Sequence, residues 1–222
     1  GTEIYEEWKR GGIKPYSSEE AMEVVSEAYR YIPEYVRVMR VQRDIPVYLI
    51  EDGVKKSNLR ELVEKRAAEK GINIREIRYR EVGLRANRGK VDWESLEPVL
   101  KRINYRASGG EEAFLQFVDE RQDALFAFLR LRLPARPHRK ELQGRVAGIR
   151  ELHVYGEVTP LHRRGRVQHR RLGKALLEEA ERIAAEEWDS RKIAVISGVG
   201  VREYYRKWGY INDGPYMSKV LV

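Results

Sequence analysis

Cysteine is absent from the 222 residues of this chain. Its absence excludes a disulfide framework, a thiolate metal site and an iron–sulfur cluster held by this chain alone, and it fits a reducing cytoplasm. No apolar run approaches the length that crosses a bilayer, and no signal-peptide pattern is present. The four histidines lack the spacing of metal ligands. We therefore expect a cytoplasmic protein with no membrane partner and no metal site.

Acidic residues are fewer than basic ones: the chain has 35 Asp and Glu and 43 Lys and Arg, which gives a net charge of +8. A basic surface favours polyanions, of which RNA and the diphosphate of coenzyme A (CoA) are the obvious candidates. A charged fraction of 35% is equally typical of the solvated surface of a heat-adapted protein. Both interpretations stay open, because total charge does not show where the charges cluster.

Two helices are predicted in the first third of the chain. One begins at Ser17 or Ser18, and the other begins at Ser57 or Asn58 and ends at Gly71. Between them lies YVRVMRVQRDIP, in which valines alternate with polar residues in the manner of a strand.

Arg37, Arg40 and Arg43 place several cations on or beside that predicted strand. An edge strand protected by charge is the commoner interpretation. The alternative is a contact with RNA phosphates.

Residues 72–110 are polar and irregular, with IREIRYREVGLRA the most strand-like portion. Alternation from Ala124 to Leu133 predicts a strand, and residues 146–154 are its expected antiparallel partner. A buried strand at 192–197, a brief helix at 201–208 and a last strand at 216–222 complete the chain.

A strand, a basic loop and an amphipathic helix follow one another between Glu151 and Trp188. The start of such a helix presents free backbone N–H groups to a diphosphate. Gln168, Gly173 and the amides of Leu172 and Lys174 are therefore candidates for holding the diphosphate of CoA. A glycine here would equally suit any tight turn into a helix.

Residues on both sides of that helix are candidates for the chemistry. A bulged strand at Glu151-Leu152-His153-Val154 would offer its backbone to the amide-like pantetheine arm. His153 is a candidate general base or a structural residue, and Glu151 is equally ambiguous. Tyr204 or Tyr205 would protonate a departing thiolate or orient a thioester carbonyl, or else pack in the core.

Several long segments resemble the catalytic subunit of Elongator and its archaeal and bacterial relatives. RELHVYG, QHRRLGKALLEEAERIA, KIAVISGVGVREYYRKWGY and GPYMSKVLV resemble its acetyltransferase domain, while GTEIYEEWKRG, KPYSSEEA, IPEYVRVMRVQRDIP, GVKKSNLREL and IRYREVG resemble the end of its radical-SAM domain. The resemblance implies an α/β (α+β) fold. Residues 72–222, linker included, would form a GNAT-type acetyltransferase domain with a mixed, largely antiparallel sheet. Residues 1–71 would be the remnant of a partial α/β radical-SAM barrel.

The resemblance also implies acetyl-CoA as cofactor and tRNA as partner, in a carboxymethyl-type modification of the wobble uridine. It places acetyl-CoA contacts at Glu151 to Val154, at Leu172, Gly173 and Lys174, and at Tyr205. S-adenosylmethionine and a [4Fe-4S] cluster belong to the missing radical-SAM portion, which is a further expected partner. Because the family's cluster-binding cysteines and the front of its barrel are not in this chain, we do not expect it to complete the radical reaction alone. The cysteine that relatives often have before the IRYREVG segment is Ile74 here. A homo-oligomer is compatible with the sequence.

One departure from the family pattern lies in the loop itself. Arg171 stands at the first glycine of the usual Gln-x-x-Gly-x-Gly, and its side chain either adds a cation to the diphosphate site or obstructs it. Two other functions remain open: a protein lysine acetyltransferase, and a tRNA-binding module with a vestigial acetyl-CoA pocket.

Overall fold

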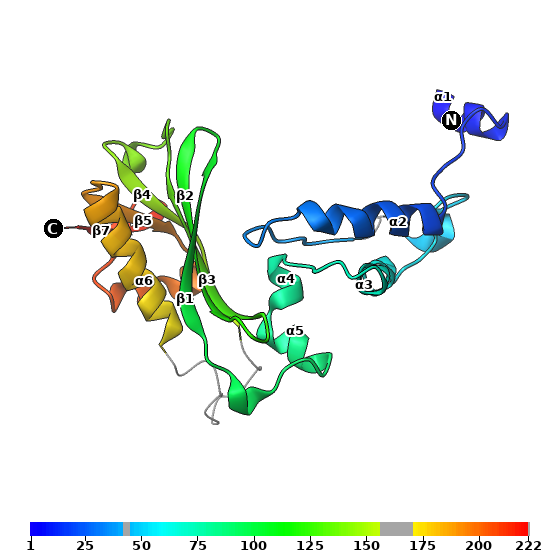
Figure 1. Cartoon of the computed structure of the whole chain (residues 1–222). Coiled ribbons are helices and arrows are strands. Elements are labelled where there is room, and N and C mark those ends of the chain that lie inside the picture. The colour runs from blue at the N-terminus through cyan, green and yellow to red at the C-terminus, as the bar shows by residue number, and fades with distance from the viewer. Residues whose placement is uncertain (42–44, 156–170, 222) are drawn as a thin grey trace. The chain divides into compact units, whose positions relative to one another are not determined.

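The computed structural model describes residues 1–41, 45–155 and 171–221. The chain divides into two units, Gly1–Tyr79 and Arg80–Val222, which are described separately. Figure 1 traces the elements of both. The domain boundary predicted at residue 71 lies eight residues before this division and stays a prediction.

The first unit is built from helices, and no strand occurs among its described residues. Its α-helices are α1 (Glu3–Lys9), α2 (Ser18–Ala28), α3 (Leu59–Glu69) and the first part of α4 (Ile77–Arg80). Ser17 and Glu20 form a reciprocal capping box at the start of α2, and Gly71 follows α3 with φ +65°. Both predicted helices are therefore confirmed.

A small apolar core joins α2 to α3. Met22, Tyr29, Val63 and Ala67 belong to it, together with Ile74, which is 2% exposed. Ile74 is thus a packed core position in this chain.

The strand predicted around Val36 and Val38 is wrong. The Val38 N–H donates to Glu76 Oε2 at 2.9 Å, and the Arg60 guanidinium donates to the Val38 carbonyl. Side chains thus satisfy the backbone groups that a neighbouring strand would have paired. Arg37 and Arg40 are exposed on this extended segment, and Arg43 lies outside the described residues.

The second unit is a seven-stranded sheet with the order β1-β2-β3-β4-β5-β7-β6. Every neighbouring pair is antiparallel except β4 and β5, which are parallel. Its strands are β1 (Val99–Ala107), β2 (Gly110–Asp119), β3 (Ala124–Leu133), β4 (Val146–Val154), β5 (Lys192–Ile196), β6 (Ile211–Asp213) and β7 (Tyr216–Val220). The mixed, largely antiparallel sheet is confirmed, as are both ends of β3 and β4.

Two segments differ from the prediction. The segment IREIRYREVGLRA forms the short helices α4 and α5 (Val82–Asn87). The buried Glu76 carboxylate stabilises the start of α4, because it accepts the amides of Arg78 and Tyr79 at 2.9 and 2.8 Å. Residues 99–107, expected to be irregular, form β1 against β2. The three-residue strand β6 has no pattern of its own and was not predicted.

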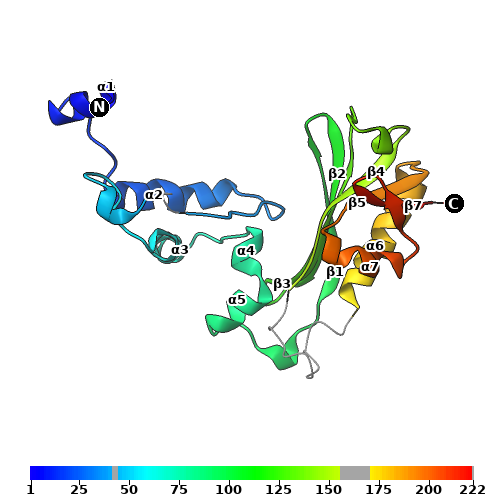
Figure 2. The same ribbon diagram turned by 180° about the vertical axis from the view of Figure 1, so that it is seen from behind.

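The helix α6 (Leu172–Arg182) lies across one face of this sheet (Figure 1). Leu176, Leu177 and Ala180 pack there against strand residues such as Leu129 and Ile149. A π-helical turn (Ile183–Glu187) extends α6. The short α7 (Arg202–Arg206), visible in Figure 2, adds Tyr205 to the same apolar cluster. None of the helices described is both long enough and apolar enough to span a bilayer.

Candidate active site at the parting of two strands

The parallel strands β4 and β5 separate halfway along β4. Their pairing ends where Ile149 faces Val195, although β4 continues to Val154. At the same level β4 bulges against β3: Leu131 pairs with Ile149 but Arg130 pairs with Glu151. Arg150 is therefore the extra residue of a β-bulge, and a bulge bends its strand. The second half of β4 has a backbone edge that β5 does not pair.

The four residues of the predicted ELHV segment divide between the two faces of the sheet. Val154 Cγ2 and Leu152 Cδ2 point to the α6 side, at 3.4 and 3.7 Å from the position that a Cβ on Gly173 would take. His153 points to the other face, where its ring lies 5.1 Å from that of Phe128. Glu151 shares that face, 3.8 Å from Arg130. Only Leu152 and Val154 are thus brought to the helix.

The start of α6 offers two backbone donors, the N–H groups of Leu172 and Gly173. These residues occupy the first two helical positions, whose N–H groups have no acceptor within a helix. The next two amides, those of Lys174 and Ala175, already donate to the Arg171 carbonyl at 3.0 and 3.1 Å. The Lys174 ammonium pairs with Glu178 at 2.7 Å and lies over the Trp208 ring. Gln168 lies outside the described residues.

Arg171 caps α6 in the left-handed conformation, with φ +53° and ψ +26°. Glycine adopts this conformation without a steric cost. The Arg171 side chain is exposed and makes no capping hydrogen bond. The backbone at this position is therefore one that glycine would adopt without cost, while the exposed side chain adds a cation near the helix start.

The two adjacent tyrosines lie in different surroundings. Tyr204 is half-buried, and its hydroxyl oxygen lies 2.8 Å from the Cβ position of Gly173. Tyr205 is 6% exposed and packs edge-on between Tyr204 and Tyr210, at 5.3 and 5.7 Å between ring centroids. Burial raises the pKa of both phenols, that of Tyr205 to about 12. Tyr204 is therefore the tyrosine that borders the helix start, and both stay protonated at neutral pH.

Leu152, Val154 and Tyr204 thus meet at Gly173, which carries one of the two donor amides of α6. A strand edge that β5 does not pair suits an amide-containing arm, and helix donors suit a diphosphate. The Tyr204 hydroxyl lies against Gly173, in the space that a side chain there would occupy, and is a proton donor beside the helix start. These features fit acetyl-CoA. Among the described residues no three His, Asp or Glu side chains gather in a way that would hold a metal ion.

Comparisons with known proteins cover the whole chain. Residues 1–69 match the family described as the Radical_SAM C-terminal domain. The chain is 51% identical over 226 residues to the tRNA uridine(34) acetyltransferase of Methanocaldococcus jannaschii, covering 100% of this chain and 41% of that protein. It is 49% identical over 224 residues to Elongator complex protein 3 of Homo sapiens, with the same two coverages.

A solved structure is also similar along the whole chain. It is that of the archaeal Methanocaldococcus infernus Elp3 with an N-terminal deletion, at a TM-score of 0.89 and 51% identity, covering 100% of this chain and 53% of that one. This chain therefore spans about two-fifths of the length of the curated relatives that it matches.

Proposed function

Because the chain belongs to the Elongator catalytic-subunit family, we propose that it serves in the acetyl-CoA-dependent, carboxymethyl-type modification of the wobble uridine of tRNA, as an acyltransferase. Residues 72–222 would bind acetyl-CoA, and residues 1–71 would be the end of the radical-SAM domain. S-adenosylmethionine and the [4Fe-4S] cluster would belong to the radical-SAM portion that this chain does not contain.

The observation that supports acetyl-CoA most directly is that the edge of β4 which β5 does not pair lies next to the start of α6. The amides of Leu172 and Gly173 would hold the diphosphate, and the backbone of Glu151 to Val154 would receive the pantetheine arm. Lys174 and the exposed Arg171 would add positive charge nearby. These assignments follow the geometry of the described residues and do not depend on Gln168.

The chemistry that acetyl-CoA supplies when bound is an activated acetyl thioester. Tyr204 Oη would hold the proton that the departing thiolate sulfur needs, because burial keeps this phenol protonated at neutral pH. Tyr205 would act from behind, since its ring packs edge-on against Tyr204 and restricts the tilt of that ring. We propose that tRNA binding triggers cleavage of the thioester.

Arg37 and Arg40 are the described residues that we propose for RNA phosphate contacts in the first unit, together with Arg43. Both side chains are exposed. Each phosphate contact that is removed should lower the salt dependence of tRNA binding by a fixed amount.

Isothermal titration calorimetry with a non-hydrolysable acetyl-CoA analogue tests the cofactor assignment. We expect wild-type binding, at least tenfold weaker binding by Gly173→Val, and unchanged or slightly weaker binding by Arg171→Gly, which removes a nearby cation but keeps the backbone. Gly200→Ala is the matched control, because a Cβ at Gly200 meets nothing within 4 Å. Binding by Arg171→Gly but not by the wild type would contradict the assignment for the natural loop. Acetylation of a basic peptide without RNA would favour a lysine acetyltransferase instead.

A further inference from the structure

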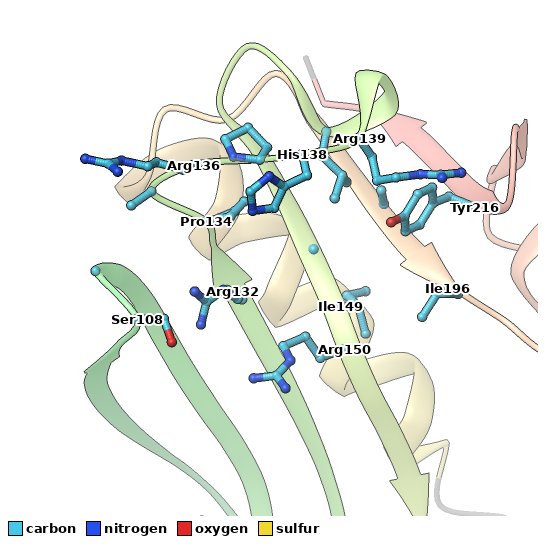
Figure 3. A pocket seen from close by; sticks show the side chains of 16 residues that line it. Ser108, Arg132, Pro134, Arg136, His138, Arg139, Ile149, Arg150, Ile196 and Tyr216 are labelled. Carbon is cyan, nitrogen blue, oxygen red and sulfur yellow. The ribbon is translucent and has the colours of Figure 1, made fainter.

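A second site lies on the face of the sheet opposite α6. It is a pocket of about 870 Å³ over β3, β4 and β5, bordered by the β3–β4 connection and by the β1–β2 turn at Ser108 and Gly109. Figure 3 shows Arg132 and Arg150 standing in front of the sheet while the helix ribbon lies behind it. We call this site the arginine pocket, after Arg132, Arg136, Arg139 and Arg150.

Every charged side chain that lines the arginine pocket is cationic. No carboxylate is among the lining residues, and His138 adds an imidazole between two of the arginines. Such a site selects an anion, because like-signed walls of low dielectric constant concentrate their field inside a concave site.

A buried carboxylate below the pocket fixes two of the arginines. Glu112, whose side chain is fully buried, accepts from Arg132 Nη1 at 2.6 Å and from Arg150 Nη1 at 3.0 Å. Each guanidinium has five N–H donors, so most of them remain for a ligand. The two guanidinium groups are thus positioned before any ligand arrives, which lowers the entropy cost of binding one.

The rest of the lining is apolar or aromatic. Ile196 and Leu142 contribute aliphatic surface, and the phenol ring of Tyr216 stands at the β5 side (Figure 3). A bare inorganic ion would leave this surface unused. A volume of this size admits one or two nucleotides, whose bases stack on aromatic rings and on guanidinium planes while their phosphates pair with arginine.

The position of the pocket relates it to the candidate active site. Ile149 and Arg150, which line it, are also the residues at which β4 bulges and separates from β5. A ligand in the pocket would lie across β4 from the start of α6. It would therefore reach the gap between the two strands from the side opposite the acetyl-CoA diphosphate.

We propose that the arginine pocket binds a single-stranded segment of the RNA substrate, with phosphates on the arginines and a base against Tyr216. This rests on the proposed function, since it deepens the tRNA assignment by giving the RNA a place. Phosphodiester oxygens match the planar, forked donors of arginine, and the aromatic ring beside them suits a base better than it suits an acidic peptide.

Fluorescence anisotropy of the 222-residue chain with labelled penta-uridylate RNA, over a series of salt concentrations, tests the proposal. Arg136→Gln/Arg150→Gln should weaken binding about tenfold and reduce the salt slope by about 1.4, at roughly 0.7 per phosphate contact on a single strand. Tyr216→Leu should also weaken binding about tenfold without changing the slope. The control is Arg121→Gln/Arg206→Gln, which removes two exposed arginines outside the pocket and should leave affinity within about twofold.

Equal loss in both double variants, or no loss in the pocket variant, would overturn the pocket assignment. Displacement of the RNA by poly-glutamate at equal charge concentration would overturn the choice of RNA over an acidic peptide. Calorimetry of the wild type with the acetyl-CoA analogue separates the two proposals. If the analogue binds and RNA does not need the pocket, only the inference about the pocket fails. If the analogue does not bind, the proposed function fails.

Discussion

The hydroxyl oxygen of Tyr204 lies against Gly173, 2.8 Å from the point at which a Cβ on that residue would stand. The two residues are thus matched: the phenol fills the space that the missing side chain leaves at the second position of α6. Val154 and Leu152 contact the same point at ordinary van der Waals distances of 3.4 and 3.7 Å. The tyrosine hydroxyl is therefore the neighbour that a larger residue at 173 would displace.

Gly173→Ala should destabilise the protein by about 1 kcal/mol. Overpacking costs about 1–3 kcal/mol, and the better helix propensity of alanine returns up to about 1 kcal/mol. In a Tyr204→Phe background the clash is gone, so the same change should stabilise by about 0.5 kcal/mol. Urea unfolding of the four proteins of this cycle measures the coupling. The same effect of Gly173→Ala in both backgrounds would show that the hydroxyl is not what limits residue 173.

Arg171→Gly should stabilise the chain by up to about 1 kcal/mol. A non-glycine residue in the left-handed conformation costs about 1–2 kcal/mol, and glycine loses part of that gain through the entropy of the unfolded chain. Arg171→Val should be the least stable of the series and Arg171→Asn should fall between, because asparagine tolerates this conformation. Thermal melts rank the variants, and a valine variant as stable as the wild type would contradict the backbone argument.

The elements that sequence predicts well are those determined by neighbouring residues. Ser17 and Glu20 are three residues apart and together start α2, while the alternation along β3 predicts its two ends, Ala124 and Leu133. The segment at Val38 behaves differently. Its hydrogen-bond partners are Arg60 and Glu76, which are 22 and 38 residues away, and the local alternation does not reveal them.

The same distinction between local and long-range information applies to the candidate site. The types and order of its residues are visible in the sequence, but the face of the sheet to which each side chain points is not. The bulge at Arg150 depends on how β4 registers against β3, and it determines that Glu151 and His153 point away from α6. The choice between Tyr204 and Tyr205 likewise depends on the rotation of the five-residue helix α7, for which the sequence offers two adjacent candidates. The arginine pocket was not predicted, although one of its residues, Arg132, alternates with leucines along β3.

Glu112→Gln should destabilise the chain by about 2–4 kcal/mol. The substitution removes a buried negative charge from between two arginines and leaves their charges without a partner in the sheet. Arg150→Gln is the matched comparison, because it removes the arginine of the Glu112–Arg150 ion pair instead of the carboxylate. Because 51% of the Arg150 side chain is exposed, its loss should cost less than about 1 kcal/mol. Chemical unfolding measures both, and equal costs would mean that the burial of Glu112 is not the source of the asymmetry.

An ion pair between α2 and the end of α3 should make the first unit sensitive to acid. Glu27 accepts from Arg30 and from Lys70, each at 2.7 Å. The Arg30 guanidinium, and after it the Lys70 ammonium, lower the pKa of the Glu27 carboxyl to about 2. A pKa that is lower in the folded than in the unfolded state stabilises the fold above the unfolded pKa, and this contribution is lost as the pH falls towards the folded pKa.

The wild type should therefore be more stable than Glu27→Gln above about pH 4.5, and the difference should disappear by about pH 2. Urea titrations at several pH values, followed by the NMR methyl resonances of Val63 and Ala67, report on this unit alone. Glu61→Gln is the control, because Glu61 is an exposed carboxylate on α3. A gap between wild type and Glu27→Gln that persists at pH 2, or one that Glu61→Gln reproduces, would mean that the Glu27 pair does not link the two helices.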